Sequence, residues 1–413
     1  MLNGEHGSAV QKAMELLVKV GNAYGAERMI DVTQSYVAFP LSEENQSFSD
    51  IIYALTENVT VKIPTTNLPL PLDLQRINEL GLPESVIETA QKIMLQRMEI
   101  YRRIGVIPSY TCDPHFLYYL RKGEHVAFTE TNVAMLTNSW FGSRTNIEGM
   151  STAMASAITG KTPEYGLHLQ ENRYGQVLIE VSADLETERF DYADYVALAH
   201  WTGKILFDQI AVYNGLPKNI RPDHVKYMCA SQIYNSAAGM FHIVGVTPEA
   251  PTLEAAFGGK KPAQRFIFGR KERAEAYEEF CSATEKKVDM VVVGCPHCSL
   301  NEISEIAQLL NGRKINKDVR LWIGTSLHTR ALAERMGLVD ITEGAGGLIL
   351  TDVCIRAAVL PPYSEALGVR VLATTSGSIA QNAYRRSKGK TTAWFGSMED
   401  CIDASVKGKW EGR

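Results

Sequence analysis

The chain has 413 residues, of which 45% are hydrophobic and 22% are charged, and its formal net charge is −5. This length and apolar content suffice for the cores of two or three domains, and they exclude a disordered chain, a collagen-like chain and a small disulfide scaffold. A mildly acidic balance without a long basic run also argues against nucleic acid or an anionic membrane as the main partner.

The N-terminal segment and the cysteines bear on location. Residues 1–6 lack the basic-then-apolar order of a secretory signal, and no run of about eighteen apolar residues predicts a membrane-spanning helix. We therefore expect a cytoplasmic protein. Seven cysteines, an odd number, then favour reduced thiols that bind metal or take part in catalysis over a disulfide framework.

Two amphipathic helical patterns dominate the N-terminal part. Apolar residues recur at helical spacing around Met14, and again at 87–94 after a start at Pro83. Between these patterns the sequence predicts a short strand at 59–61, followed by a loop rich in hydroxyl and amide groups. The candidates for substrate binding in that loop are Thr66 and Asn67.

A polar run at 142–146 precedes a predicted helix of small residues at 150–158. Hydroxyl, amide and guanidinium groups near a helix N-terminus suit an anionic ligand, although they also fit a hydrogen-bonded network at the helix entry. Glu148 is either a general base or the acidic first turn of that helix. The candidates for substrate binding in the run are Ser143, Arg144, Thr145 and Asn146.

The segment 246–262 carries three prolines and two glycines and is the strongest boundary signal in the chain. We place a domain junction there. The predicted division is an N-terminal helical or mixed segment at 1–105, a middle α/β region at 106–250 and a C-terminal α/β region at 262–413.

Short apolar runs alternate with helical patterns in the C-terminal region, as in a parallel α/β sheet. Ligands bind beyond the carboxyl ends of such strands, so the residues directly after each strand are informative. Cys295 and Ser376 hold two of these positions, which makes Ser376 a candidate catalytic residue. The predicted strands are 288–293, 320–323 and 370–373, and the predicted helices are 302–310 and 329–336.

The string from Gly294 to Cys298 allows three interpretations. Cys295 and Cys298 at a helix start would suit a thiol-disulfide oxidoreductase, but the chain is far larger than a thioredoxin-like unit. Zinc is weakly supported, because adjacent His297 and Cys298 rarely reach one tetrahedral ion and no second pair has a suitable spacing. The third is an iron-sulfur cluster held by distant cysteines in loop contexts, namely Cys112, Cys295 and Cys354. Three others are expected to be buried apolar residues: Cys229, Cys281 and Cys401.

Four motifs together resemble the large, catalytic part of aconitase X. They are Tyr110-Thr-Cys112, the block 142–168, Gly294-Cys-Pro-His297 and the closing Phe395-Gly-Ser-Met-Glu-Asp-Cys401. The resemblance spans almost the whole chain. It implies an aconitase-like α/β fold of several subdomains and a dehydratase with a three-iron or four-iron cluster as Lewis acid. The family's cysteine ligands match Cys112, Cys295 and Cys354, and Cys298 lies outside the pattern.

The resemblance also implies a partner and a substrate class. Aconitase X sites are completed by a small swivelling domain, and this chain ends after the closing motif, so we expect a separate small subunit. Relatives act on cis-3-hydroxy-L-proline or, in archaea, on mevalonate 5-phosphate. The modest charged fraction mildly favours cis-3-hydroxy-L-proline, although Tyr36 stands where the family usually has a histidine.

Catalytic roles stay open at this stage. His297 either orients a cluster ligand or the substrate, or is a structural histidine. With Glu148 and Ser376 it completes the set of candidate catalytic residues. The alternative of another class is a non-catalytic iron-sulfur binding or sensor protein.

Overall fold

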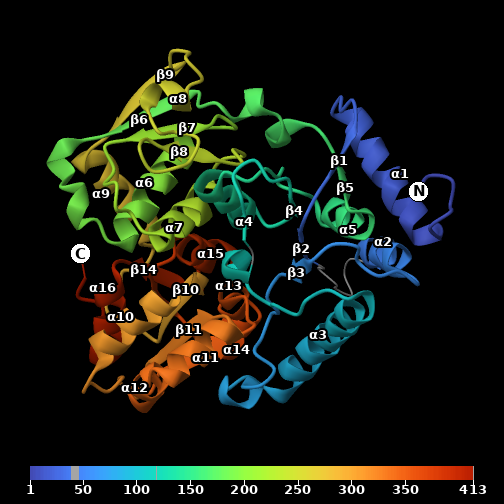
Figure 1. Ribbon diagram of the computed structural model, residues 1–413. Coiled ribbons are helices and arrows are strands. Elements are labelled where there is room, and N and C mark those ends of the chain that lie inside the picture. The colour runs from blue at the N-terminus through green and yellow to red at the C-terminus, as the bar shows by residue number, and fades with distance from the viewer. Residues whose placement is uncertain (39–45, 118, 413) are drawn as a thin grey trace.

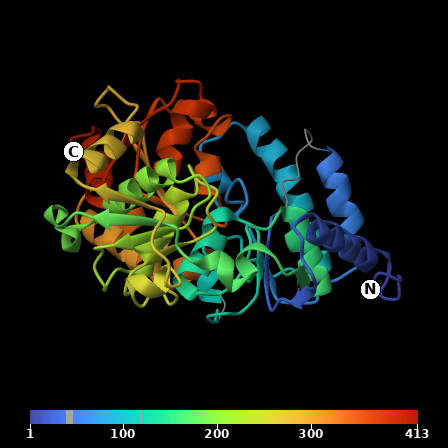
Figure 2. The same cartoon turned by 90° about the horizontal axis from the view of Figure 1, so that it is seen from above.

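The computed structural model describes residues 1–38, 46–117 and 119–412. Its described strands form sheets of two, three, four and five strands, and the last three are parallel. Figures 1 and 2 show the N-terminal helices at one end of the molecule, and the middle and C-terminal sheets side by side at the other. The predicted α/β fold class is confirmed.

The first region packs helices around a small parallel sheet with strand order β3-β2-β4. Helix α3 begins after Pro83 and ends at Gly105, whose φ of 81° gives the left-handed turn that glycine favours. Both predicted N-terminal helices are confirmed. The elements are α1 (Ser8–Ala23), β1 (Met29–Asp31), β2 (Ser35–Val37), α2 (Gln46–Thr56), β3 (Thr65–Asn67), α3 (Glu84–Ile104), β4 (Ala127–Phe128), α4 (Thr131–Leu136), α5 (Met150–Thr159) and β5 (Lys161–Pro163).

The predicted strand at 59–61 is wrong, and the strand lies instead in the segment expected to be a polar loop. Residues 65–67 are fully buried and pair in parallel with 35–37. Val59 and Val61, by contrast, are only partly buried, so their β-branched side chains do not lie in a sheet. A buried strand with polar side chains has no apolar alternation, which is why the pattern misses it.

The second region is a four-stranded parallel sheet of order β8-β7-β6-β9. The Pro- and Gly-rich segment 246–262 connects β8 to β9, so both of its ends belong to one sheet. The elements are β6 (Val177–Val181), α6 (Tyr192–Ile205), β7 (Ala211–Asn214), α7 (Pro222–Gln232), β8 (Phe241–Ile243), α8 (Leu253–Ala256), β9 (Gln264–Phe268) and α9 (Arg270–Phe280).

The third region is a five-stranded parallel sheet of order β12-β11-β10-β13-β14. Its buried apolar strands and covering helices follow the predicted pattern, and the predicted strands and helices of this region are confirmed. The elements are β10 (Met290–Cys298), α10 (Leu300–Leu310), β11 (Arg320–Thr325), α11 (Leu327–Arg335), α12 (Leu338–Gly344), β12 (Leu348–Thr351), α13 (Ile355–Ala358), α14 (Tyr363–Ala366), β13 (Val371–Thr374), α15 (Gly377–Arg386), β14 (Thr392–Phe395) and α16 (Met398–Lys407).

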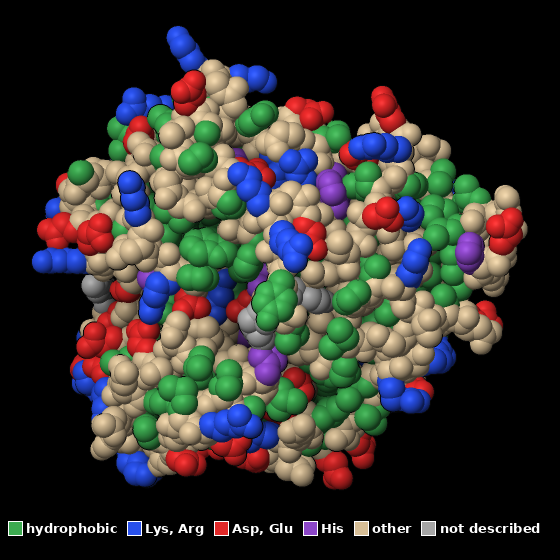
Figure 3. Space-filling model, in the orientation of Figure 1, with side chains coloured by type: hydrophobic (Ala, Val, Ile, Leu, Met, Phe, Trp, Pro, Cys, Tyr) green, Lys and Arg blue, Asp and Glu red, His purple; other side chains and the backbone are tan. Residues whose placement is uncertain are grey.

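The three regions meet near the centre of the molecule, where Figure 1 shows β3, α7 and α13. On the outer face, acidic and basic side chains alternate without a large patch of one sign (Figure 3), in keeping with the near balance of charge in the composition. Within the described ranges, no helix has the length and apolar character needed to cross a membrane.

Candidate active site

The three cysteines predicted as metal ligands line one cavity of about 340 Å³, which we call the cysteine cavity. Cys112 lies in the loop after α3, Cys295 lies within β10, and Cys354 directly precedes α13. These loops are far apart in sequence and belong to different elements, so the fold brings the thiols together. The other lining residues are Leu68, Pro69, Glu130, Thr131, Asn132, Ala230, Ile233, Tyr234, Pro296, Arg356 and Ser378.

Local hydrogen bonds hold each cysteine loop. The Asn67 side-chain oxygen accepts the backbone N–H of Ser109 at 2.9 Å, which fixes the loop before Cys112. The backbone N–H of Cys354 donates to Leu70 O at 2.6 Å. Both loops are therefore tied to β3 and the chain that directly follows it.

The loop of Cys295 depends on a close backbone approach. Gly294 has a φ of 99°, and a Cβ atom there would lie 2.1 Å from the carbonyl oxygen of Gly324 on β11. Only glycine is compatible with both conditions. The bulge in β10 that begins after Val293 therefore turns Cys295 out of the ladder and into the cavity.

The thiols influence one another electrostatically. Burial, followed by the charges of Glu130 and Cys295, raises the pKa of Cys112 well above its ordinary value. Burial likewise raises the pKa of Cys295 to about 11, although the nearby charge of Arg356 and a hydrogen bond from Ser376 oppose this rise. Both thiols are therefore protonated at neutral pH, and binding of a metal group here would release protons.

No group of three or more His, Cys, Asp or Glu side chains in the described residues converges closely enough to hold a single metal ion. A tetrahedral zinc site needs its sulfur ligands about 2.3 Å from one point. The three cysteines surround the cysteine cavity without converging in this way. The zinc interpretation of Cys295, His297 and Cys298 therefore loses its support.

Two charged residues of the cavity were missed by the sequence analysis. Glu130 directly precedes α4, its Oε2 atom is buried without a hydrogen-bond partner, and burial raises its pKa to about 7. Arg356 donates to the Tyr234 hydroxyl at 2.8 Å. Burial alone would lower the pKa of Arg356, but negative charge at Cys354 and Cys295 outweighs it, so the pKa of this guanidinium lies above its ordinary value. Proximity to Cys354 in sequence could have suggested Arg356, whereas nothing in the sequence distinguishes Glu130.

Arg144, the strongest sequence candidate for anion binding, does not line the cysteine cavity. Its two terminal nitrogens donate to His168 O at 2.8 Å and to Gln170 Oε1 at 2.5 Å. Both terminal nitrogens are satisfied within the protein, while Nε is buried without a hydrogen-bond partner. These two contacts fit the helix-entry network that was the alternative interpretation.

The neighbours of Arg144 have the same character. Ser143 donates to Arg121 O at 2.9 Å, and the backbone N–H of Thr145 donates to Asn138 Oδ1 at 3.0 Å. Asn146 accepts the backbone N–H of Leu167 at 2.9 Å. None of these side chains lines the cysteine cavity. The block organises the chain around α5.

Glu148, Thr66 and Asn67 are also buried outside the cavity lining. Glu148 is 4% exposed and accepts a hydrogen bond from Thr152 at 2.6 Å. Burial raises its pKa. Thr66 and Asn67 lie in β3, where Asn67 supports the loop of Cys112 as described above.

His297 and Ser376 are buried and do not line the cysteine cavity. His297 is 1% exposed, and both ring nitrogens contact protein groups. Ser376 accepts the backbone N–H of Ile379 at 3.4 Å at the start of α15. Neither residue lies where it could contact a molecule bound in the cysteine cavity.

Cys298 has the opposite environment to an activated thiol. It is 2% exposed, and burial raises its pKa well above the ordinary value. Nucleophilic cysteines need a lowered pKa and access. This geometry argues against thiol-disulfide exchange through Cys295 and Cys298.

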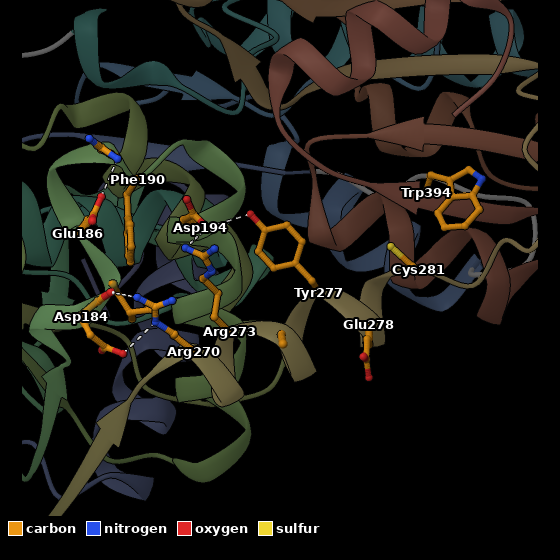
Figure 4. Close-up of a pocket in the computed structure, with 13 residues that line it drawn as sticks. Asp184, Glu186, Phe190, Asp194, Arg270, Arg273, Tyr277, Glu278, Cys281 and Trp394 are labelled. Carbon is orange, nitrogen blue, oxygen red and sulfur yellow. Dashed lines mark hydrogen bonds and ion pairs between the residues drawn. The ribbon is translucent and has the colours of Figure 1, made fainter. Parts of the chain in front are cut away.

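A larger cavity of about 750 Å³ lies elsewhere, beside α6, α9 and β14 (Figure 4). Its arginines point to carboxylates: Arg270 contacts Asp184 at 3.0 Å, and Arg273 contacts Asp194 at 3.5 Å. Cys281 is the only cysteine among its lining residues. Among its described lining residues the arginines are paired with carboxylates and none of the three candidate ligands is present, so the smaller cavity is the better candidate site.

Comparison with known proteins identifies the family. Three family models match in order: the aconitase X first domain at 1–171, the second domain at 175–278 and the third domain at 288–407. The chain belongs to the aconitase X family. It is accordingly a dehydratase, a hydro-lyase of the aconitase superfamily.

The relatives within this family carry two names. The chain is 34% identical to the phosphomevalonate dehydratase large subunit of Methanocaldococcus jannaschii over 97% of both chains. It is 33% identical to the cis-3-hydroxy-L-proline dehydratase of Pseudomonas aeruginosa over 99% of this chain and 69% of that protein. The crystal structure of Thermococcus kodakaraensis aconitase X in its holo form is similar with a TM-score of 0.84 at 30% identity, covering 98% of this chain and 97% of the other.

Proposed function

We propose that this aconitase X dehydratase binds an iron-sulfur cluster through Cys112, Cys295 and Cys354, and that it removes water from cis-3-hydroxy-L-proline together with a separate small subunit. The observation that carries the proposal is the cysteine cavity itself. It combines the three thiols with one buried carboxyl group, Glu130, and one guanidinium, Arg356.

The donor set fits a cluster. The lining contains three cysteines and no histidine within the described chain, which is enough to hold a three-iron or a four-iron cluster. Only the four-iron type would keep one iron without a protein ligand, as a Lewis acid requires. When bound, such a cluster supplies a Lewis acid that assists loss of the substrate hydroxyl as water. The N–H of His297, which donates to Cys112 Sγ at 3.2 Å, is the kind of contact that tunes cluster sulfurs.

Arg356 is suited to bind the substrate carboxylate. A guanidinium offers two parallel donors to a carboxylate, and the Tyr234 hydroxyl orients this one from the side. Tyr234 is itself held by a hydrogen bond from Asn382 on α15. The anion-binding group is thus fixed before substrate arrives.

Glu130 is suited to accept the proton that leaves carbon during dehydration. A general base works best when its pKa lies near the working pH, and burial raises the pKa of Glu130 to about 7. Its unpartnered Oε2 leaves an acceptor available. Among the described lining residues Glu130 is the only acidic side chain.

The charge of the cavity favours the amino acid as substrate. Arg356 is the only cationic side chain among the described lining residues. It matches the single carboxylate of hydroxyproline. Mevalonate 5-phosphate carries a carboxylate and a phosphate, together roughly 2.5 to 3 negative charges. In this cavity those charges would face one guanidinium and would lie beside the thiols and Glu130.

The second candidate is mevalonate 5-phosphate, favoured by one observation. The relatives named phosphomevalonate dehydratase large subunit match this chain along nearly their whole length, for example 97% in Methanocaldococcus jannaschii. In this case the small subunit would have to bring the additional cationic groups. The printed names of these relatives, as large subunits, support a separate small subunit. We also propose a cytoplasmic location, because the cysteines are free and thiols stay reduced in that compartment.

The test is an activity assay of the two-subunit complex, purified without oxygen. Each substrate is offered separately, and the product one water lighter is measured by mass spectrometry. We expect turnover of cis-3-hydroxy-L-proline. Turnover of mevalonate 5-phosphate alone would replace the substrate assignment, and a cluster with no dehydration of either would favour the non-catalytic sensor.

A further inference from the structure

We infer that His297 is a positioning residue that holds the three cysteine loops in register, so that the cysteine cavity is formed before any cluster binds. The inference rests on the proposed function in one respect, namely that these loops carry the cluster ligands. The geometric part concerns this chain alone.

The imidazole ring connects two loops that are remote in sequence. Nε2 lies 2.7 Å from Val353 O, next to Cys354, and Nδ1 lies 3.0 Å from Thr111 Oγ1, next to Cys112. A carbonyl oxygen only accepts, so Nε2 carries the proton and Nδ1 accepts from the threonine hydroxyl. Thr111 Oγ1 in turn accepts the N–H of Asp113 at 3.1 Å, which completes its hydrogen bonding.

The backbone of His297 makes two more connections. Its N–H donates to Cys112 Sγ at 3.2 Å, and its carbonyl oxygen accepts from Lys226 Nζ at 2.6 Å. Because His297 follows Cys295 by two residues, one residue contacts the loops of all three cysteines. The side chain is 1% exposed and has no open face toward a ligand, so its role is support.

Lys226 extends this connection to the second family domain. Its ammonium group is buried and lies 2.5 Å from Glu302 Oε2 and 3.9 Å from Asp113 Oδ2. Lys226, Glu302 and Asp113 belong to the second, third and first family domains respectively. A buried charge is strongly destabilising without its partners, so this group resists separation of the three domains.

The two ring nitrogens of His297 therefore support different loops. Each ring nitrogen fixes one loop, and loss of either contact should free only the loop on that side. Asparagine and glutamine separate the two contacts. An asparagine amide lies as many bonds from Cα as Nδ1 does, whereas a glutamine amide lies as many bonds away as Nε2 does.

The experiment measures backbone hydrogen exchange in the full-length, cluster-free protein. In His297→Gln we expect faster exchange in peptides covering 109–113 and wild-type exchange in 351–355. In His297→Asn we expect the reverse, and in His297→Ala both peptides should exchange faster. Equal effects of Asn and Gln on the two peptides, or no effect of Ala on either, would overturn the inference.

A matched control removes the contribution of general destabilisation. His242 is also 1% exposed, and its Nε2 contacts Arg173 O at 2.7 Å in the second domain. His242→Ala should leave both cysteine peptides unchanged. If it accelerates their exchange as much as His297→Ala does, the effect of His297 is not local and the inference fails.

The reconstituted protein gives a second readout. Loss of an outer-shell partner typically weakens a metal site by about 10- to 100-fold. We expect His297→Ala to lose iron to a chelator at least about tenfold faster than wild type. The rates of His297→Asn and His297→Gln should lie between those of wild type and His297→Ala. If the wild-type protein binds no cluster, the proposed function fails, while the exchange results still decide the role of His297.

Discussion

The segment 143–148 and the cysteine cavity contain the same kinds of polar side chain with opposite surroundings. Arg144 is held by His168 O and Gln170, and Glu148 accepts from Thr152 away from the cavity. Glu130 and Arg356, by contrast, line the cysteine cavity, where Glu130 Oε2 is buried without a partner and Arg356 donates to the neutral hydroxyl of Tyr234. Residue type alone therefore does not mark the site.

The difference lies in what remains available after folding. Buried polar groups in proteins are normally satisfied. Arg144 Nε, Glu148 Oε1 and Glu130 Oε2 are exceptions, and of these three atoms only Glu130 Oε2 belongs to a residue that lines the cysteine cavity. In the 143–148 segment the guanidinium contacts are internal, so the segment stabilises the entry to α5. In the cavity, the carboxyl group and the thiols face space that a ligand can fill. This difference leads to five predictions, taken in order of decreasing effect.

The largest effect is expected from the thiols. Substitution of Cys112, Cys295 or Cys354 by serine should abolish both the cluster and dehydratase activity, because a cluster cannot be held by the two remaining thiolates. Iron and sulfide analysis of anaerobically purified protein measures this. Cys298→Ala is the matched control from the same string, and it should keep the cluster and the activity. Retention of a full cluster in one of the serine variants would remove that cysteine from the ligand set.

Glu130→Gln should lower kcat by about 10²- to 10⁴-fold, the usual contribution of a general base. The wild-type rate should rise with pH through about 7, where the carboxyl group ionises, and the variant should lose that dependence. Cluster content is the control and should not change. A variant with the wild-type pH profile would exclude Glu130 as the base.

The thermal stability of Glu130→Gln should not fall with its activity. The folded-state pKa of Glu130 is raised by burial, so folding favours its protonated form. This contribution is lost as pH rises through about 7. Cluster-free Glu130→Gln should therefore unfold at the same or a higher temperature than wild type at pH 8. A clear loss of stability there would point to a structural role.

Arg356→Lys should reduce kcat/KM by roughly ten- to a hundredfold, since a charge-assisted hydrogen bond is worth about 1.5–3 kcal/mol and lysine lacks the second parallel donor. The equivalent change at Arg144 should alter thermal stability and leave kcat/KM nearly unchanged. Steady-state kinetics and thermal unfolding of both variants provide the comparison. A kinetic defect confined to Arg144→Lys would reverse the assignment of the two arginines.

The smallest effect is expected at Glu148. Burial raises the pKa of Glu148 in the folded protein. Ionisation of this carboxyl group therefore costs stability once the pH exceeds the ordinary pKa of a glutamate. Glu148→Gln should accordingly unfold at the same or a slightly higher temperature than wild type at neutral pH, with no difference in acid. Activity should be retained. A catalytic loss with normal stability would return Glu148 to the candidate bases.

The regular elements were largely predictable from the sequence. The C-terminal strands are buried apolar runs, and α3 has a clear apolar stripe between Pro83 and Gly105. The strand at 65–67 was missed because its side chains are polar and buried. Periodicity reports the contrast between an apolar and a polar face, and that strand has none.

The site was only partly predictable. Resemblance to the family indicated the three cysteines, which the fold gathers around one cavity. Glu130 and Arg356 could not be selected in the same way, because their burial and unusual surroundings arise from contacts between distant segments. For the same reason, Arg144 looked more promising in the sequence than it does in the structure, where His168 and Gln170 occupy its donors.

If substrate binds in the cysteine cavity beside a cluster held there, its arrival should change the electronic environment of the iron. The most direct measurement is the electron paramagnetic resonance spectrum of the reduced, cluster-loaded two-subunit complex, with and without cis-3-hydroxy-L-proline. We predict that substrate alters the spectrum of wild type and of Glu130→Gln, and that this change is lost in Arg356→Met at the same substrate concentration. A spectrum that substrate leaves unchanged while wild type turns it over would contradict the claim.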